Sequence, residues 1–89
     1  MQQCQLIVSN KLGLHARAAM KLSDLATRYQ CEINILHNDR KLDVKDILKV
    51  MTLGAAQGTE LNFTFNGCDE EEAMAAINQL FAIQFGEEN

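Results

Sequence analysis

The residues of this chain best suited to chemistry lie in the segment Gly13-Leu14-His15-Ala16-Arg17. A histidine, followed two residues later by an arginine, stands where a glycine-containing loop meets a run of good helix formers. Histidine caps a helix less well than Ser, Thr, Asp or Asn, so we expect the first helical N–H groups to remain free. Free N–H groups and the helix dipole attract an anion, and Arg17 can pair with phosphate oxygens. Because neutral imidazole is a nucleophile, the pattern suits a phosphoryl group carried on His15.

The spacing of His15 and Arg17 is a weak motif when taken alone. Its simpler interpretation is a loop histidine beside a solvated arginine. A phosphoryl group on nitrogen keeps a high transfer potential, so a protein that passes the group on would use histidine in preference to serine. The second histidine, His37, lies in a predicted turn with Asn38 and Asp39, and we interpret it as a solvated turn residue.

Composition limits the classes of function. The 89 residues fit one domain, 1–89, and 47% of them are hydrophobic and 22% charged. The net charge of −4 argues against nucleic acid as a partner, because proteins that bind a phosphate backbone are normally basic. No apolar run reaches membrane-spanning length, and the start of the chain lacks the features of a signal peptide. We therefore expect a cytoplasmic protein without a membrane partner.

The cysteines and acidic residues do not form a recognisable metal or catalytic motif. The chain has an odd number of cysteines, Cys4, Cys31 and Cys68, and no CxxC motif. The sequence therefore supports neither a zinc site nor a dithiol. We expect buried or half-buried free thiols. Paired carboxylates, Cys/His arrangements and HExxH are absent from the pattern, and a small-molecule pocket has no candidate residues. The sequence therefore predicts no metal, no cofactor and no enzyme activity of its own.

Hydrophobic periodicity predicts the elements that position His15. Alternation indicates strands, helical spacing indicates helices, and Asp46 is a good N-cap for the second helix, which Gly54 ends. The order is β-α-β-β-α-β-α, an α+β fold in which three helices cover one face of a four-stranded antiparallel sheet. The predicted strands span residues 3–8, 31–35, 41–44 and 60–65, and the predicted helices span 16–29, 47–53 and 69–85.

The second helix is apolar nearly all round, and two turns cannot bury every side. We expect Val50 and Leu53 to enter the core. The other apolar side chains would stay partly exposed and form a docking patch around His15. The predicted docking patch comprises Ala16, Met20, Ile47, Leu48, Lys49 and Met51. The alternative is that all five apolar residues of this helix lie in the core under a curved sheet.

Three longer segments carry a family resemblance. NKLGLHARAAMKL resembles the phosphorylation-site segment of the histidine-containing phosphocarrier proteins (HPr) of the bacterial phosphotransferase system. VKDILKVMTLGAAQGTEL and GCDEEEAMAAINQL resemble the rest of that family, so the resemblance spans nearly the whole chain.

The resemblance implies an open-faced β-sandwich that carries a phosphoryl group between partner proteins. His15 would accept the group on Nδ1 from a phosphoenolpyruvate-dependent enzyme I and pass it to a IIA-type acceptor. Arg17 would be the site arginine, and the backbone N–H groups of Ala16 and Arg17 would bind the phosphate. We expect this carrier to be a monomer.

Two positions depart from the family pattern. Ala18 stands where the family usually has proline, which would preorganise the first helical turn. Asp46 stands where many relatives carry a serine that a regulatory kinase phosphorylates in some bacteria. Its charge either imitates a phosphoserine or simply caps the helix.

The branch of the family is predicted from the residues around the site. Members that serve sugar transport often surround it with lysines, whereas here Asp24 and Thr27 face outward and only Lys21 and Lys49 lie nearby. This face resembles the nitrogen-related paralogue, NPr, which passes the phosphoryl group to a regulatory IIA protein. A sugar-branch HPr is one alternative. The other is a regulatory binding module that uses the docking patch without phosphoryl turnover.

Overall fold

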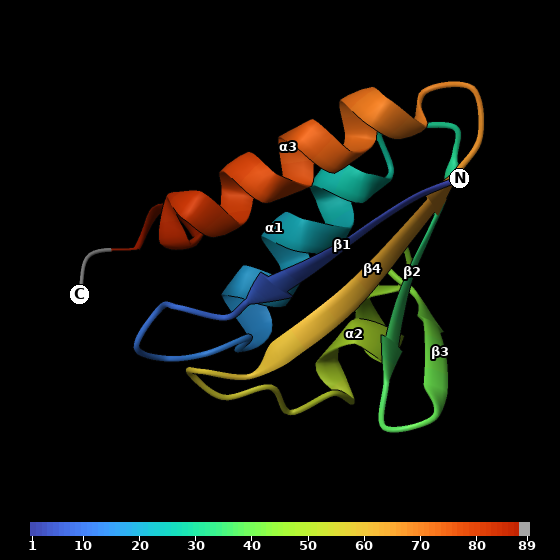
Figure 1. Ribbon diagram of the computed structural model, residues 1–89. Coiled ribbons are helices and arrows are strands. Elements are labelled where there is room, and N and C mark those ends of the chain that lie inside the picture. The colour runs from blue at the N-terminus through green and yellow to red at the C-terminus, as the bar shows by residue number, and fades with distance from the viewer. Residues whose placement is uncertain (88–89) are drawn as a thin grey trace.

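The computed structural model describes residues 1–87 and shows an open-faced β-sandwich (Figure 1). The sheet has the strand order β1-β4-β2-β3, and every neighbouring pair is antiparallel. The predicted α+β fold and element order are therefore confirmed. The elements are β1 (Gln2–Ile7), α1 (Ala16–Ala26), β2 (Glu32–His37), β3 (Arg40–Asp43), α2 (Ile47–Met51), β4 (Glu60–Asn66), α3 (Glu70–Ala82) and the short 3-10 helix η1 (Gln84–Gly86).

The strands form where side chains alternate between a polar and an apolar face. In β4, Leu61, Phe63 and Phe65 are buried while Glu60 and Asn62 are exposed. β4 pairs with both β1 and β2, so its aromatic side chains lie at the centre of the sheet. This pattern gives the sheet one apolar face for the helices and leaves the other to solvent.

The β2–β3 hairpin follows its sequence signal closely. Asn38 and Asp39 form the two-residue turn with φ angles of 49° and 63°. Two consecutive left-handed residues make the turn that best matches strand twist, and Asn and Asp tolerate this conformation. His37 pairs with Arg40 beside the turn, at the end of the hairpin.

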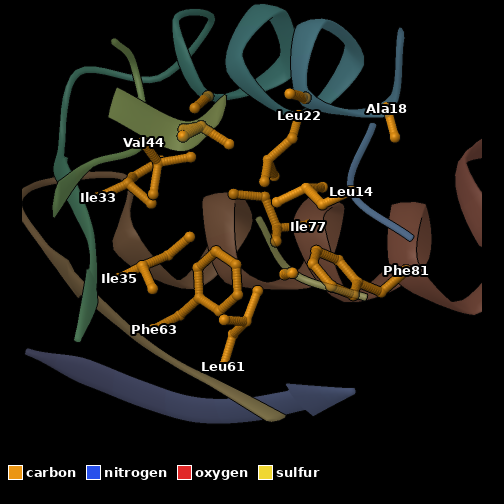
Figure 2. Close-up of a cluster of buried hydrophobic side chains, with 14 of the residues drawn as sticks. Leu14, Ala18, Leu22, Ile33, Ile35, Val44, Leu61, Phe63, Ile77 and Phe81 are labelled. Atoms are coloured by element: carbon orange, nitrogen blue, oxygen red, sulfur yellow. The ribbon is translucent and has the colours of Figure 1, made fainter. Parts of the chain in front are cut away.

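The helices bury one stripe each against the apolar face of the sheet. Figure 2 shows Leu22 of α1 and Ile77 and Phe81 of α3 pointing toward Ile35 and Phe63 of the sheet. Each of these five side chains is at most 4% exposed. Ala18 and Ser23 of α1 are also buried in this packing.

All three helices end earlier than predicted. α1 ends at Ala26 instead of Tyr29, because Arg28 and Tyr29 donate backbone hydrogen bonds three residues back, to Leu25 and Ala26. The chain tightens there and leaves the α-helical ladder. Similarly, α2 ends at Met51, two residues before the predicted Leu53.

The end of α3 differs most from the prediction. The helix stops at Ala82, and both Gln84 and Phe85 have positive φ angles, 55° and 58°. The left-handed conformation costs a non-glycine residue about 1–2 kcal/mol. Burial of the Phe85 ring, which is 1% exposed and lies 4.9 Å from the Phe81 ring, offsets this cost. Phe85 is therefore a core residue, but its backbone angles are not those of the predicted α-helix.

The cysteines are all free, and their exposures differ. Cys31 is buried and Cys4 is half-buried, as expected, whereas Cys68 is exposed, so the expectation is wrong for that thiol. Burial raises the pKa of Cys31 to about 11. Within residues 1–87, no helix is both long enough and apolar enough to cross a bilayer.

Candidate functional site

The loop before α1 is held by short hydrogen bonds that fix the position of His15. The side-chain amide of Asn10, fully buried, donates to the carbonyl oxygen of Gly13 at 2.7 Å, and the Gly13 N–H donates back to Asn10 O at 3.1 Å. The Leu14 N–H donates to Ala55 O at 2.8 Å. Figure 2 shows the Leu14 side chain among the core residues. Leu14, the residue before His15, is therefore held both by its backbone hydrogen bond and by its buried side chain.

His15 is the N-cap of α1 and has extended backbone angles. Its Nδ1 accepts a hydrogen bond from the Arg17 N–H at 3.3 Å, and its carbonyl oxygen accepts the first bond of the helix from the Ala19 N–H. The expectation that all the first N–H groups remain free is therefore wrong for Arg17. A histidine nitrogen takes the place of the usual capping oxygen and aims at the helix N-terminus.

The other ring nitrogen of His15 contacts a residue that the sequence did not single out. Nε2 lies against Oε2 of Glu87, and the second carboxylate oxygen, Oε1, accepts a hydrogen bond from Asn10 Nδ2 at 2.8 Å. The His15 side chain is 30% exposed and the Glu87 side chain 14%. The hydrogen bond from Asn10, followed by that from His15, lowers the pKa of Glu87, which is therefore ionised at neutral pH.

A hollow of about 520 Å³ opens beside His15. Three cationic side chains, from Lys11, Arg17 and Lys21, line it together with Glu87. The Lys21 ammonium also donates to the Phe85 carbonyl oxygen at 2.6 Å. An imidazole nitrogen at a helix N-terminus, next to a hollow with clustered positive charge, can receive an anionic group and bind its oxygens.

The apolar residues of α2 divide between core and surface. Val50 is fully buried, as predicted, whereas Leu48 is 71% exposed and Met51 44% exposed. The alternative that all five apolar residues lie in the core is therefore wrong. Ile47 and Leu53 are half-buried against the core, so Leu53 enters it only in part. Of the α1 residues assigned to the docking patch, Ala16 and Met20 are exposed, and Lys49 of α2 is exposed as well.

Asp46 caps α2, as the sequence indicated. Its Oδ1 accepts hydrogen bonds from the N–H groups of Leu48 and Lys49 at 3.1 and 3.3 Å. The capping role is confirmed, and imitation of a phosphoserine stays a prediction. Among residues 1–87, no three His, Cys, Asp or Glu side chains gather as metal ligands would.

A family model described as the PTS HPr component phosphorylation site matches residues 2–82. The chain belongs to the HPr family. The phosphocarrier protein HPr of Xylella fastidiosa is 41% identical over 88 residues, which cover 99% of each chain. The phosphocarrier protein NPr of Proteus mirabilis is 34% identical over 88 residues, or 98% of each. The crystal structure of HPr-C-His from Thermoanaerobacter tengcongensis has a TM-score of 0.95 and 35% identity over the full length of both chains.

Membership of the HPr family makes this protein a phosphocarrier of the phosphotransferase system. The match to the family model ends at Ala82, so Glu87 lies beyond the residues of that model. Sequence reasoning missed Glu87 and its partner Asn10. The two residues are 77 positions apart, and although Asn10 begins the segment NKLGLHARAAMKL, nothing in that segment pairs it with Glu87. Burial of the Asn10 amide, which requires hydrogen-bond partners, becomes known only from the structure.

Proposed function

We propose that this protein accepts a phosphoryl group on Nδ1 of His15 from an enzyme I-type donor that uses phosphoenolpyruvate. It then passes the group to a IIA-type acceptor in the cytoplasm. The observation that carries this proposal is the position of Nδ1, which faces the Arg17 N–H at the N-terminus of α1, beside the cationic hollow. An incoming phosphoryl group on Nδ1 would meet partial positive charge from the helix and full charge from Arg17.

For transfer, the Nδ1 lone pair must first be released from its hydrogen bond with the Arg17 N–H. The Nδ1 lone pair attacks phosphorus, the bond between phosphorus and the donor breaks, and its electron pair stays with the donor. The backbone N–H groups of Ala16 and Arg17 and the Arg17 guanidinium would bind the phosphoryl oxygens. In the onward step the acceptor attacks phosphorus and the electron pair of the Nδ1–P bond returns to the ring.

We assign partner binding to the docking patch. Its exposed apolar side chains, Met20, Leu48 and Met51, lie on α1 and α2, two helices that contact each other. Exposed apolar side chains that cluster on a small soluble domain are typical of a protein–protein interface. A donor and an acceptor that bind here in turn would each approach His15 from the same side.

For the branch of the phosphotransferase system we infer the nitrogen-related one. The support is Asp24, on the exposed side of α1, and the exposed C-cap residue Thr27, which stand in place of further cations. The sugar branch is the second candidate, because the relative named HPr is 41% identical and the one named NPr 34%.

The deciding experiment is intact-protein mass after incubation with phosphoenolpyruvate and either the sugar-branch or the nitrogen-branch enzyme I. We expect a gain of one acid-labile phosphoryl group. The enzyme I that labels the protein faster identifies the branch to which the protein belongs. His15→Ala should show no gain. His37→Ala, which changes the only other histidine of the sequence, is the matched control and should be labelled like the wild type.

Two outcomes would overturn this assignment. If His15→Ala is labelled as the wild type is, the phosphoryl group is not carried on His15. No labelling of the wild type by either donor would favour a regulatory binding module that uses the docking patch alone.

A further inference from the structure

The two ring nitrogens of His15 have different partners, and this difference determines where the ring proton lies. Nδ1 accepts the Arg17 N–H at 3.3 Å, while Nε2 contacts the carboxylate of Glu87. Only a nitrogen with a free lone pair can accept an N–H, so Nδ1 is unprotonated. The proton therefore belongs on Nε2, where an ionised carboxylate accepts it.

The carboxylate of Glu87 is itself held in place. Its Oε1 accepts from Asn10 Nδ2 at 2.8 Å, and the same amide nitrogen donates to Gly13 O at 2.7 Å. Asn10 is fully buried, so its amide has no freedom to turn toward solvent. Glu87 thus connects the imidazole to the rigid loop that precedes it.

The segment 84–87, which we name the hook, brings Glu87 to His15. Gln84, Phe85 and Gly86 all have positive φ angles, which turn the chain out of α3 and back toward α1. The buried Phe85 ring anchors the hook in the core, and Lys21 of α1 binds the Phe85 carbonyl oxygen at 2.6 Å. A left-handed backbone at two non-glycine residues is maintained only where surrounding contacts require it.

We propose that Glu87 is a positioning residue, which orients the His15 ring and keeps its proton on Nε2 so that Nδ1 is always the nucleophile. The first part of this inference concerns the unphosphorylated protein alone. The second part, its effect on transfer, rests on the proposed function.

During transfer the carboxylate would balance the charge of the ring. When Nδ1 attacks phosphorus, the Nδ1–P bond forms and the donor keeps the electron pair of the bond that breaks. The ring then carries the phosphoryl group on Nδ1 and the proton on Nε2, and it is positively charged. Glu87 pairs with that charge. In the onward step the Nδ1–P bond breaks, its electron pair returns to Nδ1, and neutral imidazole leaves in place of the far poorer leaving group imidazolate.

Within residues 1–87, the other charged side chains that line the hollow with His15 are cations. Lys11 and Arg17 line the hollow, and so does Lys21, which belongs to α1. These charges attract the carboxylate and an incoming phosphoryl group alike. Glu87 also repels that group, so a role limited to repulsion predicts faster acceptance once Glu87 is removed. A positioning role predicts slower acceptance instead.

The first test needs no partner protein. We would measure the ¹⁵N chemical shifts of the His15 ring in the wild type and in Glu87→Ala at a pH where the ring is neutral. The wild type should show the single tautomer with the proton on Nε2, and Glu87→Ala a mixture of both tautomers. Glu72→Ala, on the exposed side of α3, is the matched control and should resemble the wild type. An unchanged tautomer in Glu87→Ala would overturn the inference.

The second test measures transfer from the donor that labels the wild type. Loss of a charge-assisted hydrogen bond should slow the single-turnover rate of Glu87→Ala about tenfold. The donor concentration for half-maximal rate should stay unchanged, because Glu87 lies outside the docking patch. Glu87→Gln keeps an oxygen that accepts from Nε2 but lacks the charge, so it should restore the tautomer and not the rate.

The two proposals fail in distinguishable ways. If neither donor labels the wild type, the proposed function is wrong, and the tautomer measurement still decides whether Glu87 positions the ring. If the wild type is labelled and Glu87→Ala is labelled equally fast or faster, the transfer role of Glu87 is wrong and the assignment of His15 stands.

Discussion

The backbone of Gly13 packs so closely on the carbonyl oxygen of Ala55 that a Cβ atom at position 13 would lie 2.6 Å from it. The same oxygen accepts the Leu14 N–H at 2.8 Å. Gly13 also has a φ angle of +69°, which L side chains rarely adopt. The contact therefore ties the loop that presents His15 to the loop that follows α2, and with it to the docking patch.

Gly13→Ala should consequently destabilise the protein by more than its backbone conformation alone explains. Gly54→Ala is the matched control, because Gly54 has a similar φ of +58° and nothing within 4 Å of its added Cβ. We expect a loss of about 1 kcal/mol in unfolding free energy at Gly54. At Gly13 the loss should be about 2–4 kcal/mol, because the clash with Ala55 adds to it. Urea denaturation measures both losses. Equal losses would show that the loops separate easily.

Arg17→Ala should slow phosphoryl acceptance without changing stability. The Arg17 side chain is exposed and lines the hollow beside His15, so its removal takes away charge from the phosphoryl oxygens and little packing. We expect the rate of acceptance to fall at least about tenfold, measured by single-turnover labelling. Arg28→Ala removes an exposed arginine just after α1 and serves as the control. If Arg17→Ala and Arg28→Ala are both labelled at the wild-type rate, Arg17 is a bystander.

Met51→Glu should separate partner binding from stability. Met51 is 44% exposed, so a charge there should change the free energy of unfolding by no more than about 0.5 kcal/mol. In the centre of an apolar interface the same charge is desolvated, and we expect partner affinity to fall at least about tenfold, measured by calorimetry. Val50→Ala, one residue away and fully buried, should show the reverse, with about 2 kcal/mol lost in stability. Unfolding of Met51→Glu would place Met51 in the core.

The stability that Glu87 provides should disappear in acid. Its pKa in the folded protein lies below the ordinary value of 4.5, so the unfolded chain binds a proton at Glu87 first as the pH falls. The contribution is therefore complete above about pH 4.5 and is lost as the pH falls through the folded pKa. The difference in unfolding free energy between wild type and Glu87→Ala should therefore shrink as the pH falls below about 4.5. A difference that does not depend on pH would mean that the carboxylate charge contributes nothing.

The parts of the fold that are local in sequence were predictable from it. Alternation fixes which face of β4 holds Phe63 and Phe65, because the side-chain period of a strand is two. Asp46 is recognisable as a cap because its carboxylate reaches N–H groups only two and three residues ahead. Membership of the family was visible in the same way, from contiguous segments around His15 and Gly54.

The parts that depend on distant contacts were not predictable. Phe85 continues the apolar spacing of α3, and periodicity alone therefore extends the helix to it. What ends the helix is the packing of this ring on Phe81 and the bond from Lys21 to its carbonyl oxygen, 64 positions away. Without that turn Glu87 would not approach His15. Positive φ at a glutamine and a phenylalanine has no signal in the sequence, since both residues are ordinary helix members.

The reactivity of the three cysteines should report this packing directly. Native protein treated with iodoacetamide should be alkylated first at exposed Cys68, more slowly at half-buried Cys4, and last at Cys31. Burial raises the pKa of Cys31 to about 11, so at pH 8 to 9 both access and thiolate formation protect it. Peptide mass spectrometry gives the three rates, and in urea they should converge, because the unfolded chain exposes every thiol. Alkylation of native Cys31 as fast as Cys68 would mean that the contact between the start of β2 and the turn before α3 opens on the timescale of the reaction. That contact includes the hydrogen bond from the Cys31 N–H to Asp69 at 2.9 Å.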